Sequence, residues 1–336
     1  MKVKIKNIEY YTPKHKYSNE HFLKHFSDQG VDISGLLKVT GRNERYISED
    51  PHENSLTMAI EACEKVIRKA NIDAKDVNLV VFVSSTPEYL SPTNAVKIHE
   101  ALGLTKNANA YDMNGNCAGM IIAMDQVSRT MKTNNKIKYS LLVGSDLVVR
   151  YSRRSEAITY ANFGESACAV LLENAEENIE NNISDFIDSS SYVDSSLSCY
   201  IKFPPVGFSN VLPVDEDITK DNRIIEWIDF NTDEAFASSV DSINEILGRN
   251  NLTKDDVKLY CLSQFAKKNV DMIRDSLEEP DHKFPFVGDR FGYTGVTSPF
   301  MALADSVSKG KLKRGDYVIL WTVGAGVVAS CVLLRY

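Results

Sequence analysis

A single cysteine, Cys117, stands in a run of small residues between two apolar stretches. The pattern predicts a strand at 111–113, a sharp turn, and a helix that opens at the cysteine and is buried on nearly all sides. A thiol in the first helical turn faces unpaired backbone N–H groups and the positive end of the helix dipole, which both favour the thiolate. We therefore predict that Cys117 is a nucleophile. The alternative is an inert cysteine on a core helix.

Composition narrows the class of protein. The 336 residues carry a net charge of -8, which argues against a nucleic-acid binder. The longest apolar runs, 79–83 and 318–323, have the length of buried strands rather than membrane spans. The first residues alternate lysine with apolar side chains and lack the apolar core of a signal peptide. We expect a cytoplasmic protein that does not enter the membrane.

The cysteines occur singly, without the paired spacing of a zinc site or a disulfide framework. This favours a reducing compartment, and we predict no metal site. The six are Cys63, Cys117, Cys168, Cys199, Cys261 and Cys331.

An internal repeat predicts the architecture. Residues 71–80 and 251–260 share one phrase, and 125–128 and 305–308 share another at the same separation. Short apolar runs alternate with amphipathic stretches such as 55–69 and 233–247, which predicts βαβ units and mixed sheets covered by helices. We place the halves at 1–175 and 176–336, related by a pseudo-twofold. The serine-rich 189–198 and the proline-containing 203–213 are predicted to be loops.

Several motifs follow one another in the order seen in a known family. They are Thr40-Gly41 with residues 44–46, Asn116-Cys117-Ala118-Gly119, residues 163–170, Gln264 with Lys267-Lys268, residues 289–295, and Gly324-Ala325-Gly326. Together they resemble the ketoacyl-ACP synthase III family of the thiolase superfamily. The resemblance implies an α/β thiolase-like fold in which duplicated βαβ halves form α-β-α-β-α layers.

The resemblance also implies a reaction. Cys117 would take an acyl group from an acyl-CoA or a phosphopantetheine-carried thioester and pass it to a second substrate. The backbone N–H groups of Cys117 and Gly326 would hold the oxyanion, unless the glycines merely shape a hairpin. No cofactor would be bound permanently, and the family dimerises through the sheet of the first half.

Two positions depart from the family pattern. Members that condense by decarboxylation carry a histidine just before the glutamine matched by Gln264 and an asparagine just after the glycine matched by Gly292. Here these places hold Ser263 and Tyr293. Losing one donor to the enolate oxygen typically slows such a reaction roughly 100-fold. Ordinary decarboxylative condensation is therefore disfavoured.

The thioester handle also differs. The family often has tryptophan and arginine before the Thr-Gly pair, whereas 35–39 offers only one cation. An acyl carrier protein would instead dock on basic surface residues. The candidates for binding the donor are Lys38, Arg150, Arg153, Arg154, Lys267 and Lys268.

Three functions remain open. The first is an acyltransferase that works without decarboxylation, in specialised metabolite biosynthesis. The second is a decarboxylative synthase with a rebuilt donor set. The third is a reduced-activity subunit that pairs with an intact homologue, so that the oligomer would be a heterodimer rather than a homodimer.

Overall fold

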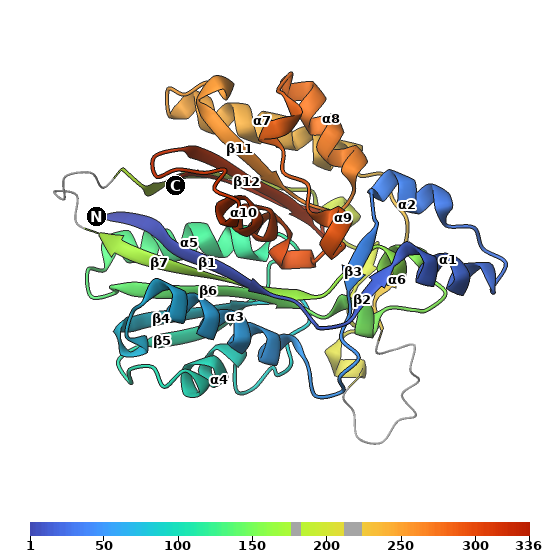
Figure 1. The fold of residues 1–336 in the computed structure, drawn as a ribbon, viewed down its shortest axis with the longest axis horizontal. Coiled ribbons are helices and arrows are strands. Elements are labelled where there is room, and N and C mark those ends of the chain that lie inside the picture. The colour runs from blue at the N-terminus through green and yellow to red at the C-terminus, as the bar shows by residue number, and fades with distance from the viewer. Residues whose placement is uncertain (176–182, 212–223) are drawn as a thin grey trace.

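The computed structural model describes residues 1–175, 183–211 and 224–336. Two β-sheets lie one above the other, with a pair of helices between them and further helices outside each sheet (Figure 1). These five layers confirm the predicted α-β-α-β-α arrangement.

The first sheet has the strand order β1-β7-β6-β4-β5. Its strands are β1 (Lys2–Tyr11), β4 (Val77–Val83), β5 (Asn109–Met113), β6 (Tyr139–Asp146) and β7 (Ser166–Ala175). β7 pairs antiparallel with β1 and β6, whereas β4 pairs parallel with β6 and β5. Every residue of β6 is buried, as expected where helices cover both faces of a sheet.

The second sheet has the order β11-β12-β13-β8. It consists of β8 (Asp185–Val193), β11 (Val257–Leu262), β12 (Tyr317–Gly324) and β13 (Val328–Arg335). β13 pairs antiparallel with β8 and β12, and β12 pairs parallel with β11. From β8 to β11 the strand pairs are antiparallel, antiparallel and parallel, which is the same order as from β1 to β4 in the first sheet. The duplication predicted from the repeated sequences is therefore confirmed.

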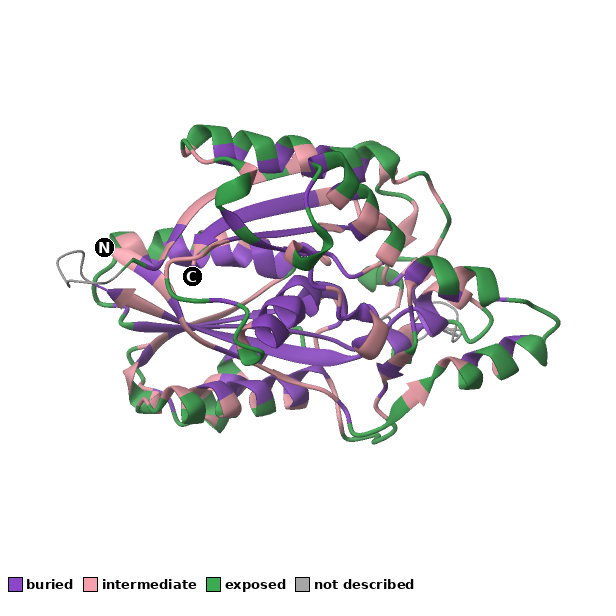
Figure 2. Ribbon diagram, turned by 45° about the horizontal axis from the view of Figure 1, so that its top comes forward, coloured by how far each residue is buried: buried purple, intermediate pink, exposed green. Residues whose placement is uncertain are grey.

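Two helices fill the space between the sheets. These are α5 (Gly119–Thr133), which contacts both sheets, and α10 (Ser298–Ser308), which packs against β1, β11 and β12. They belong to one core cluster with the facing strand residues, and Figure 2 shows this middle layer as mostly buried. Position 117 therefore lies at the entrance to the most enclosed layer of the molecule.

The outer helices are amphipathic. α3 (Ser55–Ala70) and α4 (Asn94–Ala101) cover the first sheet, and α7 (Asp233–Arg249) covers the second with α8 (Lys267–Leu277) packed beside it. α3 begins at a capping box, in which Asn54 accepts hydrogen bonds from the N–H groups of Leu56 and Thr57. Predictions for 55–69 and 233–247 are confirmed.

Shorter elements gather at the right of Figure 1, beside the ends of both sheets. They are β2 (Lys16–Ser18), α1 (Asn19–Ser27), α2 (Ser34–Thr40), β3 (Glu44–Tyr46), α6 (Ala157–Ala161), β9 (Ile201–Lys202), β10 (Glu226–Trp227) and α9 (Gly288–Phe291).

The predicted loop at 189–198 is wrong in its first part. Residues 189–193 belong to β8, which pairs with β13 through registers such as Ser191 opposite Ser330. Serine is tolerated there because β8 is an edge strand whose side chains are mostly half-buried. The described part of 203–213 contains only a short 3₁₀ turn, Phe208–Asn210, and 212–213 lie outside the described residues.

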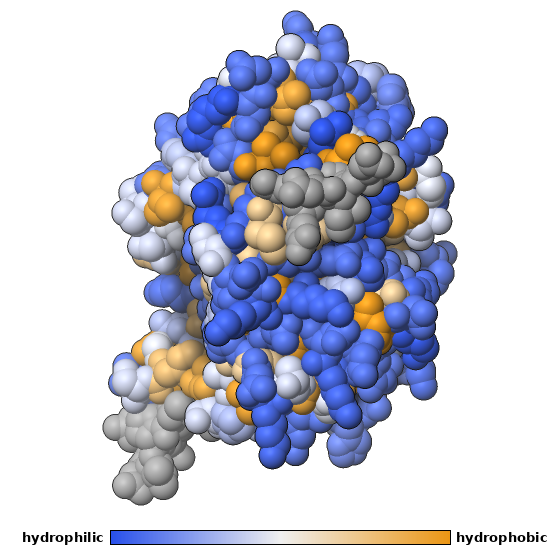
Figure 3. Space-filling view, turned by 90° about the vertical axis from the view of Figure 1, so that its left-hand side faces the viewer, coloured by the Kyte–Doolittle hydropathy of each residue, from blue (hydrophilic) through white to orange (hydrophobic). Residues whose placement is uncertain are grey.

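The strands of the first sheet all precede residue 176, and those of the second all follow residue 182. The division at 175/176 falls next to residues outside the described part and stays a prediction. On the face at the left of Figure 1, hydrophilic side chains predominate and apolar ones occur in small separate groups (Figure 3). In the described part of the chain, no helix combines the length and apolar character that a membrane span requires.

Candidate active site

Cys117 sits in a tight turn between β5 and α5. Asn116 adopts the left-handed backbone conformation with φ 52°, and the N–H of Gly119 donates to the carbonyl of Asn116 at 3.0 Å. A side chain at Gly115 would approach the backbone of Gly119 to 2.8 Å, so glycine is needed there. The helix begins at Gly119, two residues later than predicted, and Cys117 precedes its first turn.

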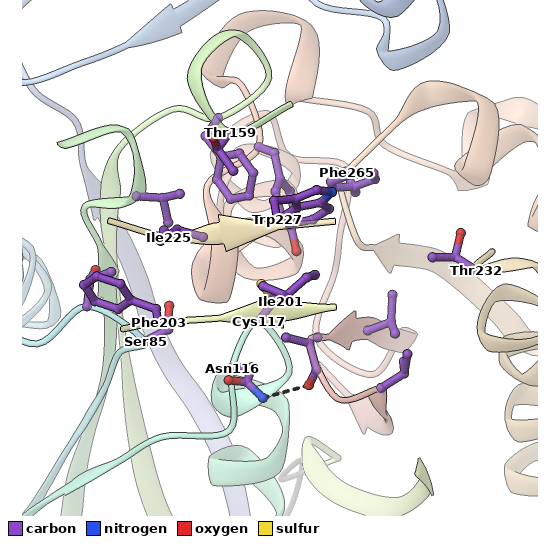
Figure 4. A pocket seen from close by; sticks show the side chains of 18 of the residues that line it. Ser85, Asn116, Cys117, Thr159, Ile201, Phe203, Ile225, Trp227, Thr232 and Phe265 are labelled. Carbon is purple, nitrogen blue, oxygen red and sulfur yellow. Dashed lines mark hydrogen bonds between the residues drawn. The ribbon is translucent and has the colours of Figure 1, made fainter. Parts of the chain in front are cut away.

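A glycine turn from the second half closes on this turn. A side chain at Gly324 would lie 2.9 Å from the Cys117 backbone nitrogen. Asn116 Nδ2 donates a hydrogen bond to the carbonyl of Ala325 at 2.8 Å (Figure 4). Gly324 and Ala325 line the same cavity as Cys117, and Gly326 follows them with φ 134°. The oxyanion role of the Gly326 N–H stays a prediction.

Tyr293 lies beside Cys117, and Ser263 lies beside Tyr293 but does not line the cavity. Tyr293 is 2% exposed, and its hydroxyl interacts with both the Cys117 thiol and the Ser263 hydroxyl. Ser263 Oγ is buried and makes no hydrogen bond of normal geometry, so its interaction with Tyr293 is a loose one. Burial, and to a lesser extent the neighbouring thiol, raises the pKa of Tyr293 well above its usual value, so the side chain stays a neutral phenol that can donate a hydrogen bond.

The prediction of a resting thiolate is wrong. Burial, together with the Asp146 carboxylate, raises the pKa of Cys117 to about 12. Hydrogen bonds from Tyr293 and from the cysteine's own N–H act in the opposite direction but are weaker. The residue remains partly exposed because it lines a cavity. The thiol is therefore accessible but neutral.

Asp146, at the end of β6, is 1% exposed and held in place by the chain around it. Its Oδ1 accepts hydrogen bonds from the backbone and hydroxyl of Ser85, and its Oδ2 accepts from the N–H of Val296 at 3.0 Å. These contacts fix a negative charge near Cys117, which works against thiolate formation.

The cavity over Cys117 has a volume of about 160 Å³, and aromatic residues make up about a third of its lining. Strands β9 and β10 cross it, so that Ile201 and Trp227 lie opposite the cysteine (Figure 4). Sequence reasoning missed this wall, because its residues come from five separate segments. The aromatic members are Phe163, Phe203, Trp227, Phe230, Phe236, Phe265 and Tyr293.

Comparisons with known proteins agree with this geometry. Residues 111–192 match the family model for 3-oxoacyl-[acyl-carrier-protein] synthase III, and residues 247–336 match the model for its C-terminal part. The chain is 28% identical over 338 residues to a beta-ketoacyl-[acyl-carrier-protein] synthase III of Clostridium perfringens, covering 99% of this chain and 98% of that one. A synthase III of Ehrlichia ruminantium is 29% identical over 304 residues, covering 89% of each chain.

This chain belongs to the ketoacyl-ACP synthase III family. Solved structures share its fold: synthase III of Aquifex aeolicus has a TM-score of 0.84 at 24% identity, covering 99% of this chain and 100% of that one. An OleA variant of Xanthomonas campestris has a TM-score of 0.82 at 16% identity, covering 100% and 99%. The relatives are transferases of the condensing type, and the thiolase-like fold is confirmed.

The basic residues that the sequence predicts to bind the acyl donor lie in two places. Lys38 on α2 and Lys267 and Lys268 on α8 form one group, because those helices pack together. Lys267 is already engaged by the carboxylate of Asp271, whereas Lys38 and Lys268 are exposed.

The arginines form the second group, at and after the 3₁₀ turn Val148–Tyr151. Arg150 donates to the carbonyl of Asp50 at 2.9 Å, and the Arg154 guanidinium lies 4.3 Å from the centre of the Tyr160 ring. Arg153 is exposed. None of the three forms an ion pair within residues 1–175, 183–211 and 224–336. Their role in donor binding stays a prediction.

Proposed function

We propose that this protein is an acyltransferase that loads an acyl group onto Cys117 and transfers it without decarboxylation. The observation that carries the proposal is the position of the Cys117 thiol, which faces a cavity beside the Tyr293 hydroxyl, with Ser263 on the other side of that hydroxyl. The site keeps a thiol and a neutral hydroxyl that can donate a hydrogen bond, and it holds neither of the usual condensing partners.

Loading is a thioester exchange. Cys117 Sγ attacks the carbonyl carbon of the donor, a new C–S bond forms, and the C–S bond to the donor's thiol breaks. Because the Cys117 thiol is neutral at rest, its proton must leave as the bond forms. The proton ends on the departing sulfur, and the Tyr293 hydroxyl is positioned to pass it along.

Transfer reverses these steps with a different nucleophile. An acceptor hydroxyl, amine, thiol or carbon nucleophile attacks the acyl carbon and expels Cys117 as the thiol, which regains its proton from the acceptor. The N–H groups of Cys117 and Gly326 would stabilise the tetrahedral oxyanion in both directions. The hydrogen bond from Asn116 Nδ2 to the carbonyl of Ala325 holds these two turns together.

The donor groups argue against a decarboxylating site. Enolate formation calls for two neutral donors aimed at one thioester oxygen. Here the Tyr293 hydroxyl is engaged with the thiol, and Ser263 Oγ is buried behind it. The two cannot be directed at one oxygen without rearrangement.

The relatives' names include an acyl carrier protein, which supports a carrier-bound or CoA-bound acyl donor here. We place the docking of such a donor on the exposed lysines of α2 and α8 and on the arginines after β6. A cytoplasmic location, a dimeric state and a role in specialised metabolism belong to the same proposal.

Intact-protein mass spectrometry tests it. The wild-type protein is mixed with acyl-CoA and acyl-carrier thioesters, with Cys117→Ala as the control, and carbon dioxide release from a malonyl thioester is measured in parallel. We expect an acyl adduct on the wild type alone and no carbon dioxide above background. Rapid malonyl decarboxylation would instead identify a rebuilt synthase. No adduct with any donor would overturn the proposal and favour a subunit that pairs with an active homologue, which co-purification would test.

A further inference from the structure

The cavity wall begins at the reactive sulfur and continues as a series of aromatic rings. Tyr293, beside Cys117, meets Phe265 nearly at right angles, with ring centres 5.2 Å apart and planes at 88°. Phe265 in turn stacks on Trp227, with centres 5.8 Å apart and planes at 8°. These three rings therefore pack directly on one another, and all three line the cavity.

Phe163 packs against two of these rings, Tyr293 and Trp227. Its ring lies 4.9 Å from that of Tyr293 and 6.3 Å from that of Trp227, in edge-to-face geometry with both. Phe163 is 3% exposed and Tyr293 2%, so these two rings are fixed by the packing around them. The four rings pack on one another and form one aromatic wall of the cavity, whose shape is set before any substrate arrives.

The size of the cavity fits one ring. A cavity of about 150 Å³ in another protein admits benzene, so about 160 Å³ accommodates a phenyl group or a chain of roughly six carbons. The described part of the lining contains no charged side chain. A free carboxylate on the acyl group would lose its hydration there without a cationic partner, and such acyl groups are strongly disfavoured.

Aromatic geometry distinguishes the two neutral occupants. A ring gains offset-stacked and edge-to-face contacts in addition to the burial of apolar area, worth about 2- to 10-fold in affinity, whereas an alkyl chain gains burial alone. We infer that Cys117 accepts an aromatic acyl group, with the ring attached to the carbonyl directly or through one carbon. In this inference, which rests on the proposed acyl transfer, Trp227 and Phe265 determine the specificity.

The test uses thioesters of N-acetylcysteamine, which retain the reacting end of a pantetheine donor but need no docking surface. Benzoyl, hexanoyl and succinyl thioesters are compared by the rate at which each forms an adduct on Cys117, measured by intact mass and peptide mapping. After each rate is divided by the rate at which the same thioester acylates free cysteine, we expect benzoyl to react about 2- to 10-fold faster than hexanoyl, and succinyl to give no adduct.

Variants locate the selectivity. Trp227→Ala should bring the benzoyl-to-hexanoyl ratio close to one. Phe208→Ala should leave the ratio unchanged, because Phe208 is exposed and does not line the cavity. Trp227→Leu preserves apolar bulk while removing the ring, and it is used if the alanine variant does not fold. Circular dichroism verifies the fold of each variant.

The outcomes separate the two claims. Faster reaction of hexanoyl, a succinyl adduct, or an unchanged ratio in both Trp227 variants would overturn the aromatic assignment while leaving acyl transfer intact. Absence of every adduct from the folded wild type would overturn the proposed function and the assignment with it.

Discussion

Replacing Tyr293 with phenylalanine should make Cys117 less reactive, although the change opens space beside the sulfur. The hydrogen bond from Tyr293 lowers the pKa of Cys117 against the larger effect of burial. A hydrogen bond to a charged group contributes about 1.5–3 kcal/mol, which corresponds to about 1–2 pKa units. Tyr293→Phe should therefore raise the pKa of Cys117 further, because only the thiolate loses a stabilising donor.

The expected rate follows from this shift. At a fixed pH below the pKa, the thiolate fraction falls roughly 10- to 100-fold. A more basic thiolate is a better nucleophile, and this regains about half of the loss on a logarithmic scale. The net prediction is alkylation by iodoacetamide that is roughly 3- to 10-fold slower. In the wild type the rate should rise about tenfold per pH unit between pH 7 and 10 without levelling off, because the pKa is about 12.

The assay is best performed in a Cys199→Ser background, since Cys199 is the exposed cysteine and the others except Cys117 are buried. Adducts are assigned by peptide mapping. Tyr111→Phe serves as the matched control, because Tyr111 lies on β5 and does not line the cavity. A wild-type rate that levels off below pH 9 would refute the raised pKa. Equal or faster alkylation of Tyr293→Phe would refute the role assigned to the hydroxyl.

Three further predictions concern the scaffold. Gly324→Ala should slow acylation of Cys117 at least tenfold, because the new methyl group would press on the Cys117 backbone. Gly248→Ala is the control and should leave the rate unchanged, because the space around Gly248 is open. The rates of adduct formation are compared, and equal rates for the two variants would contradict the close approach. Burial raises the pKa of Glu165 to about 7, so the folded state binds a proton more tightly than the unfolded state, and stability should fall as pH rises from about 4.5 to 7. Between pH 4.5 and 7, the unfolding free energy of Glu165→Gln, measured with urea, should rise by about 3 kcal/mol relative to that of wild type. If the two proteins show the same dependence on pH, the raised pKa of Glu165 is contradicted. Asn54→Ala should lower the unfolding free energy by about 1 kcal/mol through loss of the α3 cap, and a thermal or urea midpoint equal to that of wild type would show that the cap contributes nothing.

The fold could be predicted because its signals are local and repeated. The shared phrases at 71–80 and 251–260 correspond to the approaches to β4 and β11, which occupy equivalent places in the two sheets. The serine-rich strand β8 could not be predicted in this way. Its hydrogen-bonding partner, β13, lies more than a hundred residues away, and strand pairing overrides local preference.

Three neighbouring residues of the site could be predicted to lie together, whereas its aromatic wall and its electrostatics could not. Motif spacing brought Cys117, Ser263 and Tyr293 together correctly, because each follows a strand end or a short helix in the same region. The thiolate prediction failed because it considered only the adjacent helix. The buried surroundings and the charge of Asp146, which lies on a different strand, dominate the titration of the thiol.

The aromatic wall had a weak signal that sequence reasoning did not use. Phe203, Trp227 and Phe230 are large aromatic residues in stretches that otherwise resemble surface loops. Large aromatic residues in a loop indicate that the loop covers an apolar surface or cavity. Their convergence on Cys117 depends on the pairing of β9 with β10, which joins segments about 25 residues apart.

The hydrogen bond between Asn116 and Ala325 joins the two halves of the chain, which matters for engineering chimeric proteins. Each half of the chain supplies one side of the cavity around Cys117, so the proposed site needs both halves. A chimera that joins the first half of this protein to the second half of a relative should work only if the turns at Asn116 and Ala325 come from the same protein.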